Sequence, residues 1–196
     1  MISIFDYGAG NLQSVKNTLG ALGAPYELIR DANALRSAAK IILPGVGHFG
    51  QMMRALDQLR VREALVERIH AGVPFLGICL GLQALFTSSE EAPEERGLGI
   101  YEGQVRRFHG ELRIPHMGWN QVQTLRTTRL LNGGSPYFYF ANSYYCPVIP
   151  ATAATCDYIV PFTAILEHGN VCGVQFHPEK SGPAGLAVVR RFIQDC

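Results

Sequence analysis

The chain has 196 residues, of which 47% are hydrophobic and 17% are charged, and its formal charge is +1. This length and composition predict one globular domain over residues 1–196 with a sizeable core. The 17 basic and 16 acidic residues are spread along the chain without the basic stripe of a nucleic-acid-binding protein. No apolar run approaches the roughly 20 residues of a membrane-spanning helix, so we expect neither nucleic acid nor a membrane as a partner.

The first half of the chain alternates short apolar strands with helices. Strands are expected over residues 2–5, 26–29, 41–43 and 73–78. A helix is expected to follow Asn11, its N-cap, and to end at Gly23. One or two more helices are expected between Leu56 and Gly72, and residues 80–86 are expected to begin another. Such alternation predicts a parallel sheet covered by helices on both faces, and therefore an α/β fold.

The second half has a different order of predicted strands and helices. Residues 104–108, 120–125, 137–140 and 162–166 have the pattern of strands without helices between them, which predicts added antiparallel pairing. Residues 182–193 predict a final helix with apolar side chains at helical spacing. The acidic segment 88–96 is typical of a solvated loop.

Five cysteines are present, an odd number, and none forms a CxxC pair: Cys79, Cys146, Cys156, Cys172 and Cys196. The N-terminus reads as a first strand without the basic start of a signal peptide. These features argue against a disulfide framework and against a structural zinc site. We therefore expect a reducing, cytoplasmic compartment, in which a single thiol stays free.

The segment 77–81, Gly-Ile-Cys-Leu-Gly, has the form of a nucleophile elbow with cysteine in place of serine. A strand enters, Cys79 occupies a tight turn, and a helix leaves. The helix N-terminus favours a thiolate through its dipole and its free N–H groups. The alternative is that Cys79 is a small buried apolar residue, which is the commoner fate of cysteine. The strand and helix around it favour the nucleophile.

A thiol nucleophile requires a base and a group that orients the base. His177 and Glu179 follow the apolar run 171–176, with Pro178 between them holding His177 outside the helical region. In an extended segment, residues i and i+2 point to the same side, so Glu179 is within reach of the imidazole. Taken alone, this tripeptide would also suit a capped strand end. The order of Cys79, His177 and Glu179 after different strands favours a catalytic triad.

An oxyanion hole completes this chemistry. The backbone N–H of Leu80 is one donor by the geometry of the elbow. The loop 44–47, Pro-Gly-Val-Gly, follows an earlier strand, and its glycines permit the unusual backbone angles needed to present a second N–H. Alone, this loop would be only a turn.

Two segments together resemble the signatures of class I (triad) glutamine amidotransferases: residues 74–83 around Cys79 and residues 175–179 around His177. Residues 6–11 (DYGAGN), 114–120 (IPHMGWN) and 139–145 (YFANSYY) narrow the likeness to the glutaminase subunits of imidazole glycerol phosphate synthase. The similarity runs from Met1 to the last helix. It implies one glutamine amidotransferase type 1 domain that hydrolyses glutamine without a metal or cofactor.

The resemblance also implies a partner, a separate cyclase subunit with a (β/α)8 barrel, in a one-to-one heterodimer. The cyclase would use the ammonia to make imidazole glycerol phosphate and aminoimidazole carboxamide ribonucleotide in histidine biosynthesis. The resemblance implies that the oxyanion would be held by backbone N–H groups of Val46, Gly47 and Leu80. It implies that bound glutamine would contact Gly47, Gln83, Ser143 and Tyr144. The face that meets the barrel would carry Asn11, Trp119, Tyr139 and Lys180.

One position departs from the family pattern, because Asn142 stands where many members have histidine. Asparagine forms hydrogen bonds but does not titrate, so a cationic role there is in doubt. Two alternatives stay open. One is the glutaminase subunit of another amidotransferase, such as anthranilate, aminodeoxychorismate or pyridoxal phosphate synthase, and the other is a catalytically idle subunit that only binds a partner.

Overall fold

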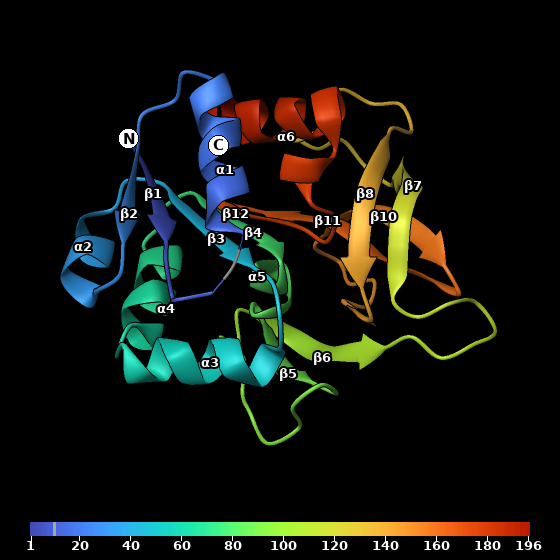
Figure 1. The fold of residues 1–196 in the computed structure, drawn as a ribbon, viewed down its shortest axis with the longest axis horizontal. Coiled ribbons are helices and arrows are strands. Elements are labelled where there is room, and N and C mark those ends of the chain that lie inside the picture. The colour runs from blue at the N-terminus through green and yellow to red at the C-terminus, as the bar shows by residue number, and fades with distance from the viewer. Residues whose placement is uncertain (10) are drawn as a thin grey trace.

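The computed structural model describes residues 1–9 and 11–196. Its main sheet contains nine strands: β1 (Ile2–Phe5), β2 (Tyr26–Ile29), β3 (Ile41–Gly45), β4 (Phe75–Cys79), β7 (His116–Thr124), β8 (Tyr137–Asn142), β10 (Thr152–Tyr158), β11 (Val160–His168) and β12 (Val171–Val174). Their spatial order is β2-β1-β3-β4-β12-β11-β10-β7-β8 (Figure 1). The predicted α/β fold is confirmed.

The sheet has a parallel half and an antiparallel half, as predicted. Strands β2, β1, β3, β4 and β12 are parallel to one another, whereas β11, β10, β7 and β8 continue the sheet with antiparallel pairing. Strand β12 joins the two halves, although it comes last in the chain. It pairs with β4 in the register Val174 to Ile78, so both strands end at the same edge of the sheet.

Helices cover both faces of the parallel half. Figure 1 shows α1 (Leu12–Ala21) and α6 (Gly182–Asp195) on one face, with α3 (Phe49–Gln58) and α4 (Arg62–His70) on the other. Two buried apolar clusters match these layers: Val15, Leu19 and Phe192 pack on the first face, and Met52, Leu56 and Leu65 on the second. Within the described part of the chain, no helix has the length and apolarity needed to span a membrane.

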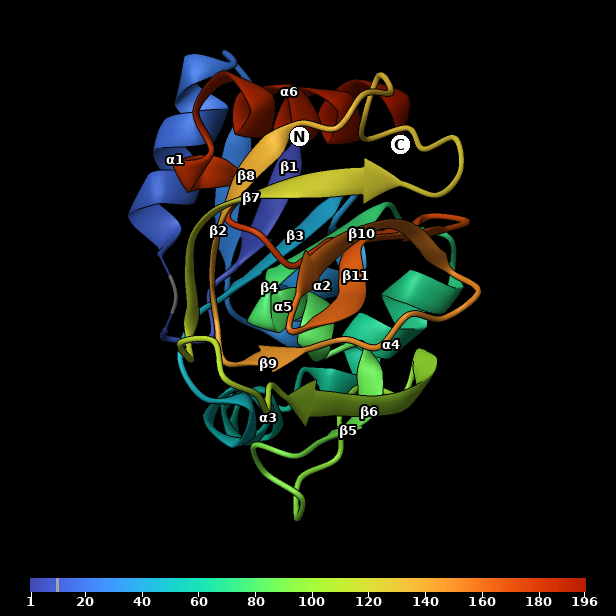
Figure 2. The ribbon, with the colours of Figure 1, turned by 90° about the vertical axis from the view of Figure 1, so that its right-hand side faces the viewer.

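The helix expected from Leu80 to Phe86 is wrong in its length. Helix α5 covers only Leu80–Gln83, and β5 (Phe86–Ser89) begins a second sheet with β6 (Tyr101–Arg107) and β9 (Tyr144–Tyr145). Figure 2 shows this small sheet beside α3. Phe86 is fully buried and pairs with Tyr101, so burial in the second sheet overrides the local helical pattern.

The acidic segment 88–96 is not simply a solvated loop. Ser89 and Ala92 are buried, and the Glu91 carboxylate accepts a hydrogen bond from the Phe49 N–H at 2.7 Å. Because this N–H belongs to the first turn of α3, Glu91 satisfies an otherwise free helix donor and adds favourable charge at that end. The segment therefore folds back onto the main body of the protein.

The starts of helices α1 and α2 show details that the sequence did not predict. Asn11 stands at the N-cap of α1 as predicted, but its side chain accepts from the Ser14 hydroxyl at 2.8 Å and forms no bond to a backbone N–H. A short helix that the sequence analysis did not include, α2 (Ala32–Ser37), is capped by Asp31, whose carboxylate accepts from the N–H groups of Asn33 and Ala34.

Candidate active site

Cys79 is the last residue of β4 and lies at the turn into α5. Its backbone angles, φ 53° and ψ −106°, are rare for residues with a side chain. Glycines permit this turn by close packing: a Cβ on Gly81 would lie 2.0 Å from the Leu43 carbonyl oxygen, and one on Gly77 would lie 2.5 Å from the Gly81 carbonyl oxygen. Only glycine fits at either position. The turn has the geometry expected of a nucleophile elbow.

His177 reaches the same edge of the sheet because it follows β12, the neighbour of β4. Its backbone N–H donates to the Tyr139 carbonyl at 2.9 Å, and its own carbonyl accepts from the Ser181 hydroxyl at 2.7 Å. These two bonds fix the backbone on both sides of the residue. The His177 side chain is almost fully buried, and its Nδ1 lies 2.8 Å from Glu179 Oε1.

Glu179 contacts His177 by a route that differs from the predicted one. His177 itself is extended, with φ −98° and ψ 96°, but Pro178–Lys180 form the 3₁₀ helix η1. The carboxylate is thus brought back to the imidazole by a turn and not by an extended segment. Its second oxygen, Oε2, is buried and has no hydrogen-bond partner among the described residues.

The charges around His177 favour its protonated form. Burial would lower the pKa of His177, but the hydrogen bond and negative charge of a Cys79 thiolate, together with those of Glu179, outweigh burial and raise the pKa to about 10. The imidazole of His177 therefore links the Cys79 sulfur to the Glu179 carboxylate in one chain of interactions. This arrangement suits a cysteine nucleophile and a proton-transferring base.

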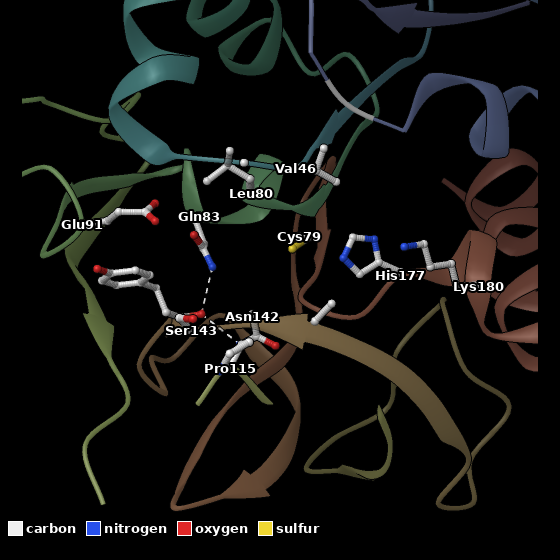
Figure 3. A pocket seen from close by; sticks show the side chains of 13 residues that line it. Val46, Cys79, Leu80, Gln83, Glu91, Pro115, Asn142, Ser143, His177 and Lys180 are labelled. Atoms are coloured by element: carbon white, nitrogen blue, oxygen red, sulfur yellow. Dashed lines mark hydrogen bonds between the residues drawn. The ribbon is translucent and has the colours of Figure 1, made fainter. Parts of the chain in front are cut away.

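A pocket of about 380 Å³ opens over Cys79. Figure 3 shows Cys79 and His177 facing each other in it, with Val46 and Leu80 above the sulfur and Gln83 and Ser143 to one side. Eight of the predicted residues line this pocket besides Cys79: Val46, Gly47, Leu80, Gln83, Ser143, Tyr144, His177 and Lys180. The structure therefore brings together predicted residues from four separate parts of the chain.

A network of side-chain amides that the sequence analysis did not predict lies beside Cys79. Gln175 is fully buried and donates to Cys79 Sγ at 3.5 Å, while its oxygen accepts from Gln83 at 3.1 Å. Gln83 also donates to the Tyr144 carbonyl at 3.0 Å, and Asn142 donates to the same carbonyl at 2.9 Å. The sequence signal for Gln175 was its polar side chain in the otherwise apolar run 171–176.

Glu91 is a second residue missed from sequence. It lines the pocket, and in Figure 3 it lies on the opposite side from Lys180. The carboxylate bonded to the first turn of α3 therefore also faces the pocket. A polar substrate in this pocket would meet a negative side chain at one end and a positive one at the other. The acidic segment 88–96 contained the signal, but it did not show which glutamate turns inward.

The loop between β3 and α3 supplies the other wall. Gly47 has φ 102°, which favours glycine. The Val46 carbonyl accepts from the Tyr7 hydroxyl at 3.5 Å, and the buried Tyr7 side chain has its pKa raised to about 12 by burial, despite this hydrogen bond. Tyr7 thus links the loop to the segment after β1.

The predicted partner contacts lie beside the pocket. Trp119 and Tyr139 are paired across β7 and β8, with ring centroids 6.3 Å apart, and the Lys180 amine lies 5.8 Å from the Tyr139 ring. Trp119 is 56% exposed, an unusual state for an indole. Asn11 stands at the start of α1, the helix that packs beside η1.

The sequence and the fold were compared with those of known proteins. The profile of the family described as "Glutamine amidotransferase class-I" matches residues 3–196. A protein of Methanothermobacter thermautotrophicus named "Imidazole glycerol phosphate synthase subunit HisH" is 46% identical over 196 residues, covering 99% of this chain and 98% of that protein. A Thermus thermophilus protein of the same name is 45% identical over 195 residues, covering 97% of each chain.

Solved structures share the fold at low sequence identity. One, described as "Crystal structure of glutamine amidotransferase", has a TM-score of 0.78 at 19% identity and covers 98% of this chain and 97% of its own. Another, "Structure of PurLQS from Thermotoga maritima", has a TM-score of 0.76 at 17% identity, with 98% and 96% covered. These structures show the shared fold, and the profile match and the full-length relatives establish that the chain belongs to the class-I glutamine amidotransferases, as an enzyme of the HisH group.

Proposed function

We propose that this chain hydrolyses glutamine to glutamate and ammonia, with Cys79 as nucleophile, His177 as acid and base, and Glu179 as the group that orients His177. One observation carries the proposal. The sulfur at a strained strand-to-helix turn and an imidazole bonded to a buried carboxylate meet at the floor of one pocket. We further propose that residues 1–196 act as one amidotransferase domain.

The proposed reaction is acyl transfer through a thioester. The Cys79 thiolate attacks the side-chain amide carbon of glutamine, and backbone N–H groups of Leu80 and of the loop bearing Val46 and Gly47 hold the oxyanion. The imidazolium of His177 protonates the departing nitrogen, which leaves as ammonia. Neutral His177 then takes a proton from water, and the hydroxide that forms cleaves the thioester to release glutamate.

The pocket walls suggest how glutamine is oriented. We propose that Gln83 and the backbone at Ser143 and Tyr144 contact its α-amino and α-carboxylate groups, and that the Glu91 carboxylate pairs with the α-ammonium. Hydrogen bonds support this assignment: Gln83 donates to Gln175 and to the Tyr144 carbonyl, and Asn142 donates to the same carbonyl. These bonds fix the Tyr144 carbonyl and the Gln83 side chain before substrate enters.

The nucleophile can be tested by covalent trapping and by Cys79→Ala. A diazoketone analogue of glutamine should add once per chain, at Cys79, and Cys79→Ala should lose both the adduct and glutamine hydrolysis. Cys146→Ala is the matched control, because Cys146 is also buried but does not line the pocket. Measurable glutamine turnover by Cys79→Ala would overturn the assignment. An unmodified Cys79 and no turnover under any condition would favour the idle subunit.

We also propose that the ammonia passes to a cyclase subunit with a (β/α)8 barrel, in a one-to-one complex that serves histidine biosynthesis. The names of the relatives and the exposed Trp119, which contacts the half-buried Tyr139 beside the pocket, support this partner. The test is glutaminase rate against barrel concentration, with and without the cyclase's nucleotide. A glutaminase rate that did not change with barrel concentration would favour the alternative that the chain is the glutaminase subunit of a different synthase.

A further inference from the structure

Two of the five cysteines lie side by side, far from the pocket. Cys172 Sγ and Cys196 Sγ are 3.7 Å apart, close enough to share a proton. Cys172 belongs to β12 and is fully buried, whereas Cys196 follows α6 and is partly exposed. The sequence analysis gave no reason to pair any two of the cysteines, and none of the five, all within the described residues, is in a disulfide. The close pair is therefore a feature that only the fold creates.

Lys40 holds Cys196 next to its neighbour. Its amine donates to three carbonyl oxygens at the end of α6, those of Phe192 at 2.9 Å, Ile193 at 2.8 Å and Cys196 at 2.6 Å. The same amine lies 5.2 Å from the Phe192 ring. These hydrogen bonds from one cation join the last turn of α6, including the Cys196 backbone, to the start of β3.

The surroundings also suit a reactive sulfur. The Arg129 guanidinium lies 4.0 Å from Cys172 Sγ and is itself paired with Glu167 at 3.0 Å. The hydrogen bond from Cys172 lowers the pKa of the Cys196 thiol to about 7; burial and the Glu167 charge oppose this, and the positive charges of Arg129 and Lys40 add to it. Thiolate is the form that attacks peroxides and disulfides. Cys196 has the access for such a reaction, and Cys172 has the position to resolve it.

We propose that Cys172 and Cys196 form an oxidation-sensitive dithiol whose oxidant is a peroxide. The Cys196 thiolate attacks one peroxide oxygen, the O–O bond breaks, and a sulfenic acid and hydroxide form; the hydroxide becomes water by taking up the proton that the Cys196 thiol had released. The Cys172 sulfur then attacks the sulfenic sulfur, the S–O bond breaks, and the hydroxyl leaves as water with the Cys172 proton. One peroxide is reduced to two waters while two thiols become one disulfide, which an external thiol reverses.

The bond would form well away from the proposed chemistry. His177 is five residue steps beyond Cys172 along β12 and its extension, which corresponds to about 16 Å at the rise of an extended strand. The disulfide would fasten the end of α6 to the start of β12 without consuming Cys79. Oxidation at this site and loss of the nucleophile are thus separable events.

The experiment maps the disulfide in the full chain carrying Cys79→Ala, which removes the other reactive thiol. After treatment with hydrogen peroxide and blocking of free thiols, cleavage after glutamate gives residues 168–179 and 180–196. These contain Cys172 and Cys196, respectively, as their only cysteine. We expect the two fragments to be linked, lighter than their sum by two hydrogen atoms, and separated again by dithiothreitol.

Cys196→Ser at the partly exposed position should abolish the linked fragment. Cys156→Ser, at a buried cysteine without a sulfur neighbour in the described residues, should retain it. Two results would overturn the proposal: both fragments recovered with blocked, unlinked thiols, or Cys196 recovered only as sulfinic acid while Cys172 stays a thiol. The same oxidation should also be run in urea, where α6 and β12 separate. An equal yield of the linked fragments there would show that the two cysteines pair by chance and would contradict the proposal.

Discussion

The contact between Glu179 and His177 gives a quantitative prediction. In Glu179→Gln, the amide oxygen can still accept from Nδ1–H, and the NH₂ group takes the place of Oε2, which has no partner among the described residues. Shape and tautomer are therefore retained, and the loss is the difference between a charged and a neutral hydrogen bond. That difference is about 1–2 kcal/mol, which corresponds to roughly a 5- to 30-fold decrease in kcat for glutamine hydrolysis.

Removing the base itself should cost more. His177→Ala loses both proton transfers, worth roughly 10²–10⁴-fold. The assay is glutamate release by purified protein with its cyclase partner, measured across pH. Because the carboxylate raises the pKa of His177, Glu179→Gln should also move the alkaline limb of the profile to lower pH.

The matched control is Glu167→Gln, which makes the same change at another buried carboxylate, bonded to Thr128 and Arg129. It should lower stability and leave the turnover of the folded protein unchanged. If Glu179→Gln were as damaging as His177→Ala, or if it left both the rate and the pH profile untouched, the orienting role would be refuted.

Three further changes test the elbow, a buried histidine and the partner face. Gly81→Ala should abolish turnover and lower the unfolding midpoint, because its Cβ would meet a backbone carbonyl at 2.0 Å; wild-type activity would contradict the close packing. Burial lowers the pKa of His116 to about 4, below its unfolded value of about 6.5. The unfolded state therefore binds more protons in this window, and stability should fall by about 3 kcal/mol as pH drops from 6.5 to 4. Midpoints of denaturant unfolding, measured from pH 6.5 to 4, should fall with pH in the wild type and fall less in His116→Phe. An equal fall in both proteins would refute the role of His116. Lys180→Glu should weaken barrel binding and the stimulation of hydrolysis in a titration, whereas unchanged stimulation would remove Lys180 from the interface.

The sequence predicted the parallel half well because that half follows local rules. Each strand there is short and apolar, each helix has apolar residues at helical spacing, and glycines mark the turns. The proposed nucleophile and base could also be identified from sequence, since Cys79 and His177 each follow directly on an apolar, strand-like run. Their adjacency was not visible, because it depends on β12 pairing with β4 across almost one hundred residues of sequence.

The missed features share a physical cause. Gln175 and Glu91 acquire their positions from tertiary contacts, with the Cys79 sulfur and with the first turn of α3. Neither contact leaves a periodic trace in the sequence. Phe86 likewise has the pattern of a helix residue until a second sheet is present to pair with it. Local propensity is a weak guide wherever burial is decided by distant segments.

The position of β12 has a consequence for how this protein is made. Strand β12, at the centre of the sheet, is synthesised after all the other strands, so β4 leaves the ribosome with one edge unpaired. Until residues 171–174 arrive, that apolar edge is open to pairing with other chains. The long separation between β4 and β12 should also make late sheet closure slow. A nascent chain truncated before Val171 would therefore lack the proposed base and be prone to aggregation, so the segment that completes the candidate active site also completes the fold.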